Sequence, residues 1–264
     1  MRAFALACLA LASCATGGDD HYPAATASAS PEAMRAVRCS PAQRFVREAP
    51  TVVRKGVAHL VTLVPLAKDK AGRLAPAVAA AFMNDRLDWE TATRLQQLLS
   101  AEEIVSFAAA LDSASVQAVV SASVAYEPDA ALLARFVADR LALSDERSTR
   151  VQALMAASWS PSMLDRLSRA PVAAAGRVVA AALADDDSAR RAELLRVAEA
   201  GRPVDAAALL VACAFLWREL DDAVLDEATA YFSSSAGQRA TAAVLEAAIS
   251  SLLQLALEVE GRVH

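Results

Sequence analysis

The chain contains three histidines, the side chain that most often serves as a general base or metal ligand near neutral pH. His21 lies in a polar N-terminal stretch and His264 is the last residue, which leaves His59 for a structured site. Nucleophilic catalysis by serine needs an imidazole that a third group holds in place. His59 stands between Ala58 and Leu60 in an apolar helical pattern. We therefore expect a packed or half-exposed histidine without a catalytic role.

Two runs of acidic residues, 185–187 and 221–222, are the next candidates for chemistry, as ligands for a hard cation. Neither has the alternating ligand spacing of a calcium loop. Both stand where predicted helices begin, and helix N-termini favour negative charge, so we interpret them as caps and solvated turns. Paired carboxylates could hydrolyse glycosides, but the spacing singles out no pair. The sequence also has no cluster of cysteines and histidines at the spacing of a zinc site, and no glycine-rich loop that could bind phosphate. We therefore predict no metal, no cofactor and no catalytic residue.

Four cysteines, at positions 8, 14, 39 and 213, could support covalent chemistry. Cys8 and Cys14 belong to the N-terminal segment, so Cys39 and Cys213 are the pair that could link distant parts of the folded chain. Such a pair can form a disulfide in an oxidising compartment, and this one would close a very long loop. The alternative is that Cys213, in an apolar stretch, is simply a small buried residue. The sequence leaves both interpretations open.

The first fourteen residues have the pattern of an export signal. One positive charge precedes an uncharged run over 3–13, which is shorter than the roughly 20 residues that span a bilayer. The end of this run, Leu11-Ala12-Ser13-Cys14, resembles the lipobox of bacterial lipoproteins. That resemblance implies cleavage before Cys14 and acylation of its thiol. The alternative is an ordinary signal peptide cut near Ala12 or Ala15, which would also export the chain.

Cleavage before Cys14 would remove residues 1–13 and leave residues 14–30 as a polar tether, for which we expect disorder. Several acyl chains on one cysteine anchor a protein stably without any transmembrane helix. Thr16, two residues after Cys14, is not acidic. By resemblance to proteobacterial lipoproteins, this favours the outer membrane, with the protein facing the periplasm.

The rest of the chain predicts an all-α fold of about a dozen helices. Alanine, the strongest helix former, dominates a composition that is 56% hydrophobic and has eight glycines. Ser100-Ala101-Glu102-Glu103 forms a capping box, the clearest start signal in the chain. In the N-terminal half we expect helices that start at Ser30-Pro31, run from Ser40-Pro41 to Pro50, cover 51–66 and 71–87, and start at Asp88, Ser100, Ser113 and Asp129. In the C-terminal half we expect helices that start at Ser144 and Ser160-Pro161, run from Pro171 to about 184, end at Gly201, cover 206–217, and start at Asp221 or Asp222. The last helix should run from the glycine turn to about Glu260, where Gly261 ends it.

One of these helices, 206–217, carries no charge over twelve residues. A helix that is apolar on every side is normally buried within a larger fold. We therefore expect 206–217 to be the central helix of the C-terminal half.

A weak internal similarity relates 99–117 to 220–238, each a capped short helix, a serine-bearing turn and an alanine-rich helix. It predicts an array of α-hairpins or a bundle with two related halves, 31–143 and 144–264. The alternative is that alanine-rich helices match one another by composition alone.

The segment 220–260 resembles an exported bacterial family, the domain-of-unknown-function family twenty fifty-nine. The resemblance rests on an aromatic pair, a serine turn and a glycine before a long helix: Tyr231, Phe232, Ser234, Ala236 and Gly237. Ser235 departs from the pattern, because proline is usual there. The resemblance implies a helical domain in the cell envelope, with no activity to transfer. From the residues themselves, we expect Phe232 to pack inward and Gly237 to allow a close turn or a left-handed backbone.

These observations favour a lipid-anchored, non-enzymatic module that binds a protein or envelope component in a groove between helices. The acidic excess, 31 acidic against 26 basic residues, argues against nucleic acid as a partner. A periplasmic carrier of an apolar ligand is the first alternative. A carboxylate-dependent envelope hydrolase is the second.

The lipobox leads to a direct test. We expect the wild-type chain to incorporate a tagged palmitate and to fractionate with membranes, and the Cys14→Ser variant to lose both properties, because the thiol is the acylation site. Metabolic labelling followed by membrane fractionation measures the two together. An unlabelled, soluble periplasmic wild-type protein would instead establish an ordinary signal peptide.

Overall fold

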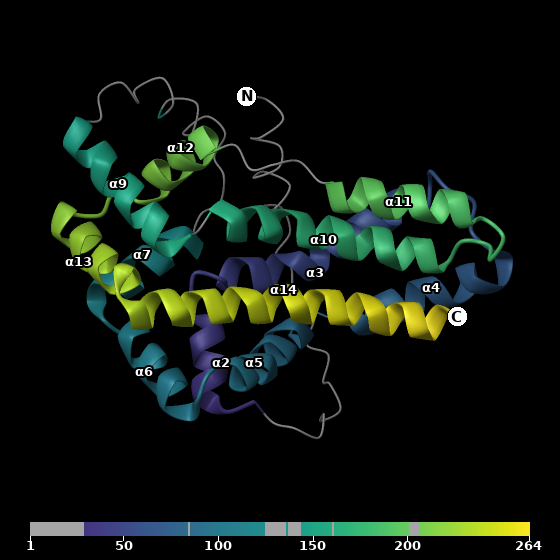
Figure 1. The fold of residues 1–264 in the computed structure, drawn as a ribbon, viewed down its shortest axis with the longest axis horizontal. Helices are drawn as coiled ribbons and strands as arrows, with labels where there is room; N and C mark the ends of the chain where they lie inside the picture. Colours follow the sequence, from purple (N-terminus) through teal and green to yellow (C-terminus); the bar gives the residue numbers. More distant parts are fainter. Residues whose placement is uncertain (1–28, 84, 125–135, 137–143, 160, 201–205) are drawn as a thin grey trace.

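The computed structural model describes residues 29–83, 85–124, 136, 144–159, 161–200 and 206–264 (Figure 1). Within these residues the chain forms twelve α-helices and no strand, which confirms the predicted all-α class. The signal segment 1–13, nearly all of the tether 14–30, all but residue 136 of the helix expected over 129–143, and Gly201 lie outside the described residues.

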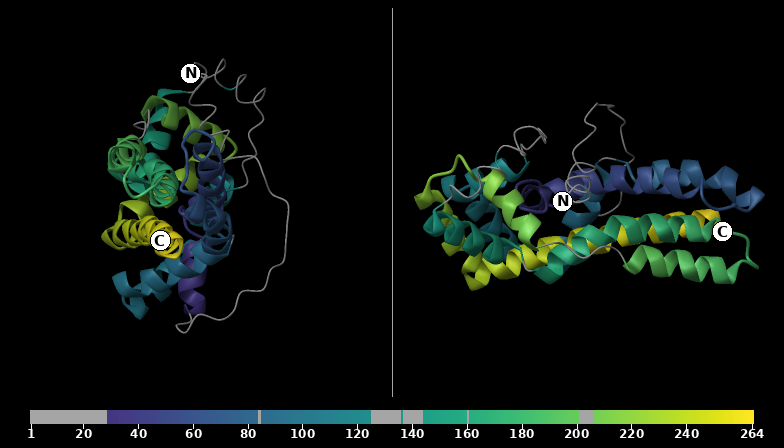
Figure 2. Two further views of the ribbon diagram at one scale, coloured as in Figure 1. Left: turned by 90° about the vertical axis from the view of Figure 1, so that its right-hand side faces the viewer. Right: turned by 90° about the horizontal axis from the view of Figure 1, so that it is seen from above.

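The twelve described helices are numbered in chain order. Their bounds are α2 (Pro31–Arg38), α3 (Gln43–Leu60), α4 (Lys68–Ala81), α5 (Arg86–Leu98), α6 (Ala101–Leu111), α7 (Ala114–Val124), α9 (Asp145–Ser158), α10 (Pro161–Ala181), α11 (Ser188–Ala200), α12 (Ala206–Leu216), α13 (Asp222–Ser233) and α14 (Ser235–Val263). Helices α3, α4, α10, α11 and most of α14 form an elongated body (Figures 1 and 2). Helices α6, α7, α9, α12 and α13 lie together at one end of this body, around the start of α14 (Figures 1 and 2).

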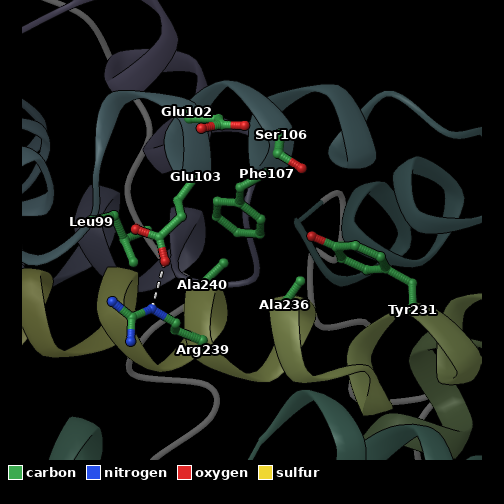
Figure 3. Close-up of a pocket in the computed structure, with 9 residues that line it drawn as sticks. All are labelled: Leu99, Glu102, Glu103, Ser106, Phe107, Tyr231, Ala236, Arg239 and Ala240. Atoms are coloured by element: carbon green, nitrogen blue, oxygen red, sulfur yellow. Dashed lines mark ion pairs between the residues drawn. The ribbon is translucent and has the colours of Figure 1, made fainter.

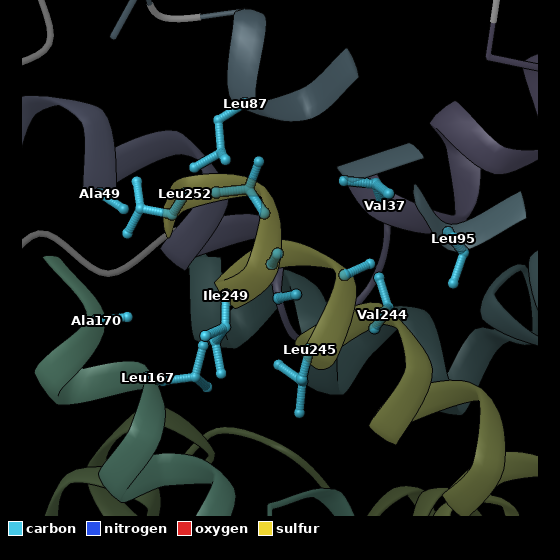
Figure 4. Close-up of a cluster of buried hydrophobic side chains, with 14 of the residues drawn as sticks. Val37, Ala49, Leu87, Leu95, Leu167, Ala170, Val244, Leu245, Ile249 and Leu252 are labelled. Carbon is cyan, nitrogen blue, oxygen red and sulfur yellow. The ribbon is translucent and has the colours of Figure 1, made fainter. Parts of the chain in front are cut away.

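The long helix α14 is the centre of the packing. It lies against α10, α5 and α4 along most of its length and against α13 and α6 near its start. In Figure 4, Val244, Leu245, Ile249 and Leu252 of α14 point into an apolar cluster with side chains from α2, α3, α5 and α10. Leu252 is fully buried, and burying one leucine side chain stabilises a fold by about 1.5–3 kcal/mol.

The prediction that 206–217 would be central was wrong. Helix α12 packs at one end of the molecule against α9 and α7, and Leu209 and Leu210 are only partly buried. Glu246 of α14 pairs with the exposed Arg166 and Glu258 pairs with the largely buried Arg86, while fourteen other residues of the helix are buried. Absence of charge was therefore a poorer guide to the central helix than length, because a 29-residue helix can contact many neighbours.

Three prolines lie inside helices, and two of them, Pro50 and Pro171, we expected at helix ends. Pro50, Pro76 and Pro171 are within α3, α4 and α10 respectively. An interior proline removes a backbone hydrogen bond and costs about 3 kcal/mol, so packing of these helices must offset that cost. Pro50 and Pro171 are themselves buried.

Two further predicted boundaries were wrong. Asp88 does not cap α5 but lies in its first turn, where its carboxylate accepts a hydrogen bond from Arg38 at 2.9 Å. Gly261 does not end α14, which continues to Val263 because Val259 and Val263 are both buried in the core.

Three predicted serine caps, at Ser30, Ser100 and Ser144, are confirmed, whereas α3 begins at Gln43 and not at Ser40-Pro41. The Ser100 hydroxyl accepts a hydrogen bond from the Glu103 amide at 3.3 Å, and the Glu103 carboxylate accepts one from the Ser100 amide at 2.8 Å. Ser30 caps α2 and Ser144 caps α9, each hydroxyl accepting from an amide three residues later at 3.1 Å. Such caps satisfy backbone donors that the helix itself leaves unpaired.

One buried cluster extends from Ala29 to Val263 and crosses the predicted boundary near 143/144, since α10 packs on both α3 and α14. The segments 99–117 and 220–238 both form a short helix, a turn and a second helix, as the internal similarity predicted. A common origin for the two halves stays a prediction, because helices of this kind also arise from composition.

Among the described residues, α14 is long and apolar enough to cross a membrane, with a mean hydropathy of 1.6 in its most apolar window. In the fold, 61% of that window is buried, so we interpret α14 as a core helix. Helices α6 and α7 pass the same test only as a pair, and they are bent by 81° relative to each other.

Close contact between α10 and α11 leads to a stability prediction. A methyl group at Gly176 would lie 2.4 Å from the Ala198 Cβ, whereas one at Gly72 of α4 would meet nothing within 4 Å. We expect Gly176→Ala to lower the free energy of unfolding by about 1–3 kcal/mol, as overpacking does, and Gly72→Ala to raise it by up to about 1 kcal/mol. Urea unfolding followed by circular dichroism measures both. Equal stability of the two variants would contradict the close contact.

Candidate functional site

A hollow of about 240 Å³ lies where α6 meets the turn between α13 and α14 (Figure 3). Its lining combines a buried apolar floor with an exposed polar rim. The lining residues are Leu99, Glu102, Glu103, Ser106, Phe107, Tyr231, Ala236, Arg239 and Ala240. Leu99, Phe107 and Ala240 are each at most 5% exposed and form the floor.

The α13–α14 turn is built by close hydrogen bonding. The Ser234 hydroxyl donates to the Tyr231 carbonyl at 2.7 Å and accepts from the Gly237 amide at 3.0 Å. A Cβ on Gly237 would lie 2.2 Å from the Tyr231 carbonyl oxygen, so no larger residue fits without a shift of the backbone. Of the two predicted roles for Gly237, close approach is therefore the one that the structure shows.

The five residues of the predicted turn have three roles. Tyr231 and Ala236 line the hollow, whereas Ser234 and Gly237 hold the turn behind it. Phe232 is fully buried, as predicted, and its ring meets the Tyr231 ring edge-on with centroids 5.3 Å apart. The turn thus presents Tyr231 to the hollow while Phe232 anchors it in the core.

An ion pair between α6 and α14 lies at one edge of the hollow. The Glu103 carboxylate of α6 lies 2.7 Å from the Arg239 Nε of α14, and Figure 3 shows this ion pair at one edge of the hollow. Hydrogen bonds from the backbone and side chain of Ser100 lower the pKa of Glu103, and Arg239 lowers it further. Glu103 is therefore ionised at neutral pH and is unsuited to act as a general acid.

Tyr231 lines the hollow with its hydroxyl pointing into it (Figure 3). Partial burial disfavours the phenolate and raises the pKa of Tyr231 to about 12. The side chain therefore stays neutral and can both donate and accept a hydrogen bond.

The two histidines in the described part of the chain, His59 and His264, do not line this hollow. His59 is exposed near the C-terminal end of α3, whereas we expected a packed or half-exposed side chain. His264, the last residue, is exposed and lies beside α4, with its Nδ1 3.5 Å from the Lys70 Nζ. The same ammonium, buried in α4, donates to the Leu183 carbonyl at 3.3 Å and to Asp185 at 2.6 Å. This cluster joins the end of α14 to α4 and to the α10–α11 connection.

The acidic runs are used in ion pairs. The hydrogen bond from Lys70 lowers the pKa of Asp185, and Asp187 lies 2.7 Å from Arg190. Asp221 occupies the N-cap position of α13 without a capping bond from its side chain, and Asp222 pairs with Arg147. In the part of the chain that the structure describes, no three potential ligands gather to hold a metal ion.

Two carboxylates are more deeply buried than those of the hollow. Glu48 and Asp88 have side chains that are each 17% exposed, and desolvation raises the pKa of both. Each is bound by its own arginine, Glu48 by Arg44 at 3.0 Å and Asp88 by Arg38 at 2.9 Å. Pairing of this kind stabilises contacts within α3 and between α2 and α5.

The possible disulfide between Cys39 and Cys213, one of the two interpretations left open by the sequence, does not form in the described structure. Cys39 ends α2 and is partly buried, whereas Cys213 lies in α12 and is 4% exposed. Helices α2 and α12 are not packed neighbours. The alternative prediction, that Cys213 is a small buried residue, agrees with its position.

The α6 side of the hollow was not predicted as a site. The sequence identified Glu103 as part of a capping box at a helix start. Residues 102, 103, 106 and 107 lie on one side of that helix because of their spacing. No signal in the sequence paired this side of α6 with Tyr231 and Arg239, which lie more than a hundred residues away.

The raised pKa of Tyr231 leads to a pH prediction. In the unfolded chain a tyrosine loses its proton near pH 10, whereas in the fold Tyr231 keeps it to about 12. Stability from this group is therefore complete below about pH 10 and is lost as the pH rises to about 12. We expect an ultraviolet titration of the wild type minus Tyr231→Phe to show one phenol with a midpoint near 12. A midpoint near 10 would mean that Tyr231 is solvated.

A scan against protein-family models and searches of curated proteins and of solved structures found no match to this chain. The resemblance of 220–260 to the family of exported domains thus stays a prediction from its own residues. The site described by geometry is the hollow beside the α13–α14 turn.

Proposed function

We propose that this chain is a lipid-anchored, non-enzymatic helical module of the cell envelope that binds a protein or envelope component through the hollow between α6 and the α13–α14 turn. The observation that carries the proposal is the construction of this hollow, in which a buried apolar floor is combined with a charged rim and a neutral tyrosine. Binding sites commonly combine an apolar surface with a few polar groups that fix orientation.

The surrounding structure supports binding more than proton transfer. Glu103 has a lowered pKa and Tyr231 a raised one, so both groups keep a single protonation state around neutral pH. Groups that transfer protons in catalysis work best with a pKa near the working pH. Fixed charge and fixed hydrogen-bonding groups suit recognition.

The hollow is also held in place by rigid elements. The capping box fixes the start of α6, Ser234 fixes the start of α14, and Phe232 anchors the turn between α13 and α14. A site whose walls are fixed in this way loses little conformational entropy when a partner binds. Membrane anchorage through Cys14 would add a high local concentration of envelope components, as tethering does.

A photo-crosslinking amino acid at Ser106 of the full-length chain tests the proposal in cells. Ser106 is exposed and lines the hollow, so we expect a discrete adduct with one partner. Ala236→Phe should reduce the adduct by roughly tenfold, because the ring fills the hollow and a loss of about 1.4 kcal/mol changes affinity tenfold.

Two matched controls make the result specific. A photo-probe at Ala189, exposed on α11, should give no such adduct, and Ala223→Phe, exposed on α13 outside the hollow, should leave the Ser106 adduct unchanged. If Ala236→Phe and Ala223→Phe gave equal adducts, the hollow would not be the binding site.

A further inference from the structure

We infer that the hollow takes a basic side chain, a lysine or arginine of a partner polypeptide, with its charged end at Glu102 and its apolar stem on the floor. This inference rests on the proposed function and names the chemistry of the partner. Three features of the hollow carry it: an excess of negative charge, a free carboxylate and two aromatic rings.

The first feature is charge. Glu102 and Glu103 contribute two carboxylates to the lining, and Arg239 contributes one cation. The 2.7 Å pair of Glu103 with Arg239 neutralises that cation. An incoming anion would meet an arginine that is already bound and a second carboxylate, so the lining favours a cation.

The second feature is the carboxylate of Glu102. Glu102 is exposed at the second position of α6, and no cation of the described chain pairs with it. Most other acidic side chains around α13 and α14, such as Asp226 and Glu246, are held by arginines. Glu102 is therefore a lining carboxylate that can pair with a partner's cation.

The third feature is aromatic. Tyr231 and Phe107 both line the hollow (Figure 3), and the faces of such rings attract ammonium and guanidinium groups. The neutral Tyr231 hydroxyl can also accept a hydrogen bond from either group. Lysine and arginine side chains lay their methylene stems on apolar surfaces, and Leu99, Phe107 and Ala240 supply such a surface.

The size of the hollow agrees with this occupant. A volume of about 240 Å³ holds one long side chain, but not a folded segment of a partner. The chain as a whole carries a net charge of −5, which attracts a basic partner during encounter.

Crosslinking of short peptides to the purified full-length chain with the Ser106 photo-probe tests the inference. The probes are acetylated Ala-Lys-Ala and Ala-Arg-Ala amides, and the matched apolar control is the peptide with norleucine in the central position. We expect the two basic peptides to give roughly five- to tenfold more adduct than the norleucine peptide, the ratio for one exposed ion pair together with a cation–π contact. High salt should reduce this preference.

Substitutions then test whether the Glu102 carboxylate binds the charged group of the peptide. Glu102→Gln should lower the adduct of the lysine and arginine peptides to that of the norleucine peptide. Glu199→Gln, an exposed glutamate of α11 away from the hollow, should change nothing. Circular dichroism of both variants shows that the helices are intact.

The outcomes separate this inference from the proposed function. Equal adducts from basic and norleucine peptides would mean an apolar site and would overturn the inference. A Ser106 adduct in cells that survives Glu102→Gln but is lost in Ala236→Phe would also overturn it while supporting the proposed function. A Ser106 adduct that joins two copies of this chain would overturn both, and no adduct in cells would overturn the proposed function.

Discussion

Burial of α14 along its length is the constraint on which the rest of the fold depends. Fourteen of its residues are buried, and they contact helices that come from both ends of the sequence. Helices α5 and α10 pack directly on α14, and α2 joins the same cluster through its contacts with α5 and α6. Glu246 and Glu258 of this apolar helix pair with Arg166 and Arg86.

Small residues make this packing close. Glycine and alanine let helix backbones approach, and a Cβ on Gly56 of α3 would lie 3.0 Å from the Ala175 Cβ of α10. Alanine also supplies strong helix propensity, so the same composition that makes the chain helical lets its helices pack closely. The cost is that few large side chains fill the core, and contacts such as those of Phe82, Trp217 and Phe232 become important anchors.

The hollow is formed by the same kinds of close contact that hold the fold together. Ser234 and Gly237 force a tight turn, the turn places Tyr231 beside the start of α14, and α6 closes the other side through the pair of Glu103 with Arg239. The same Glu103 completes the capping box of α6. One side chain thus fixes a helix start and a wall of the hollow.

The sequence by itself determined the helical class, the caps at Ser30, Ser100 and Ser144, and the inward position of Phe232. These depend on neighbours within four residues or on periodicity, which a sequence displays directly. Tertiary structure alone decided that α3 and α10 run through Pro50 and Pro171, that α14 and not α12 is central, and that α6 meets Tyr231. Those features depend on contacts between residues far apart in the chain, whose energy outweighs local preference and leaves no local pattern.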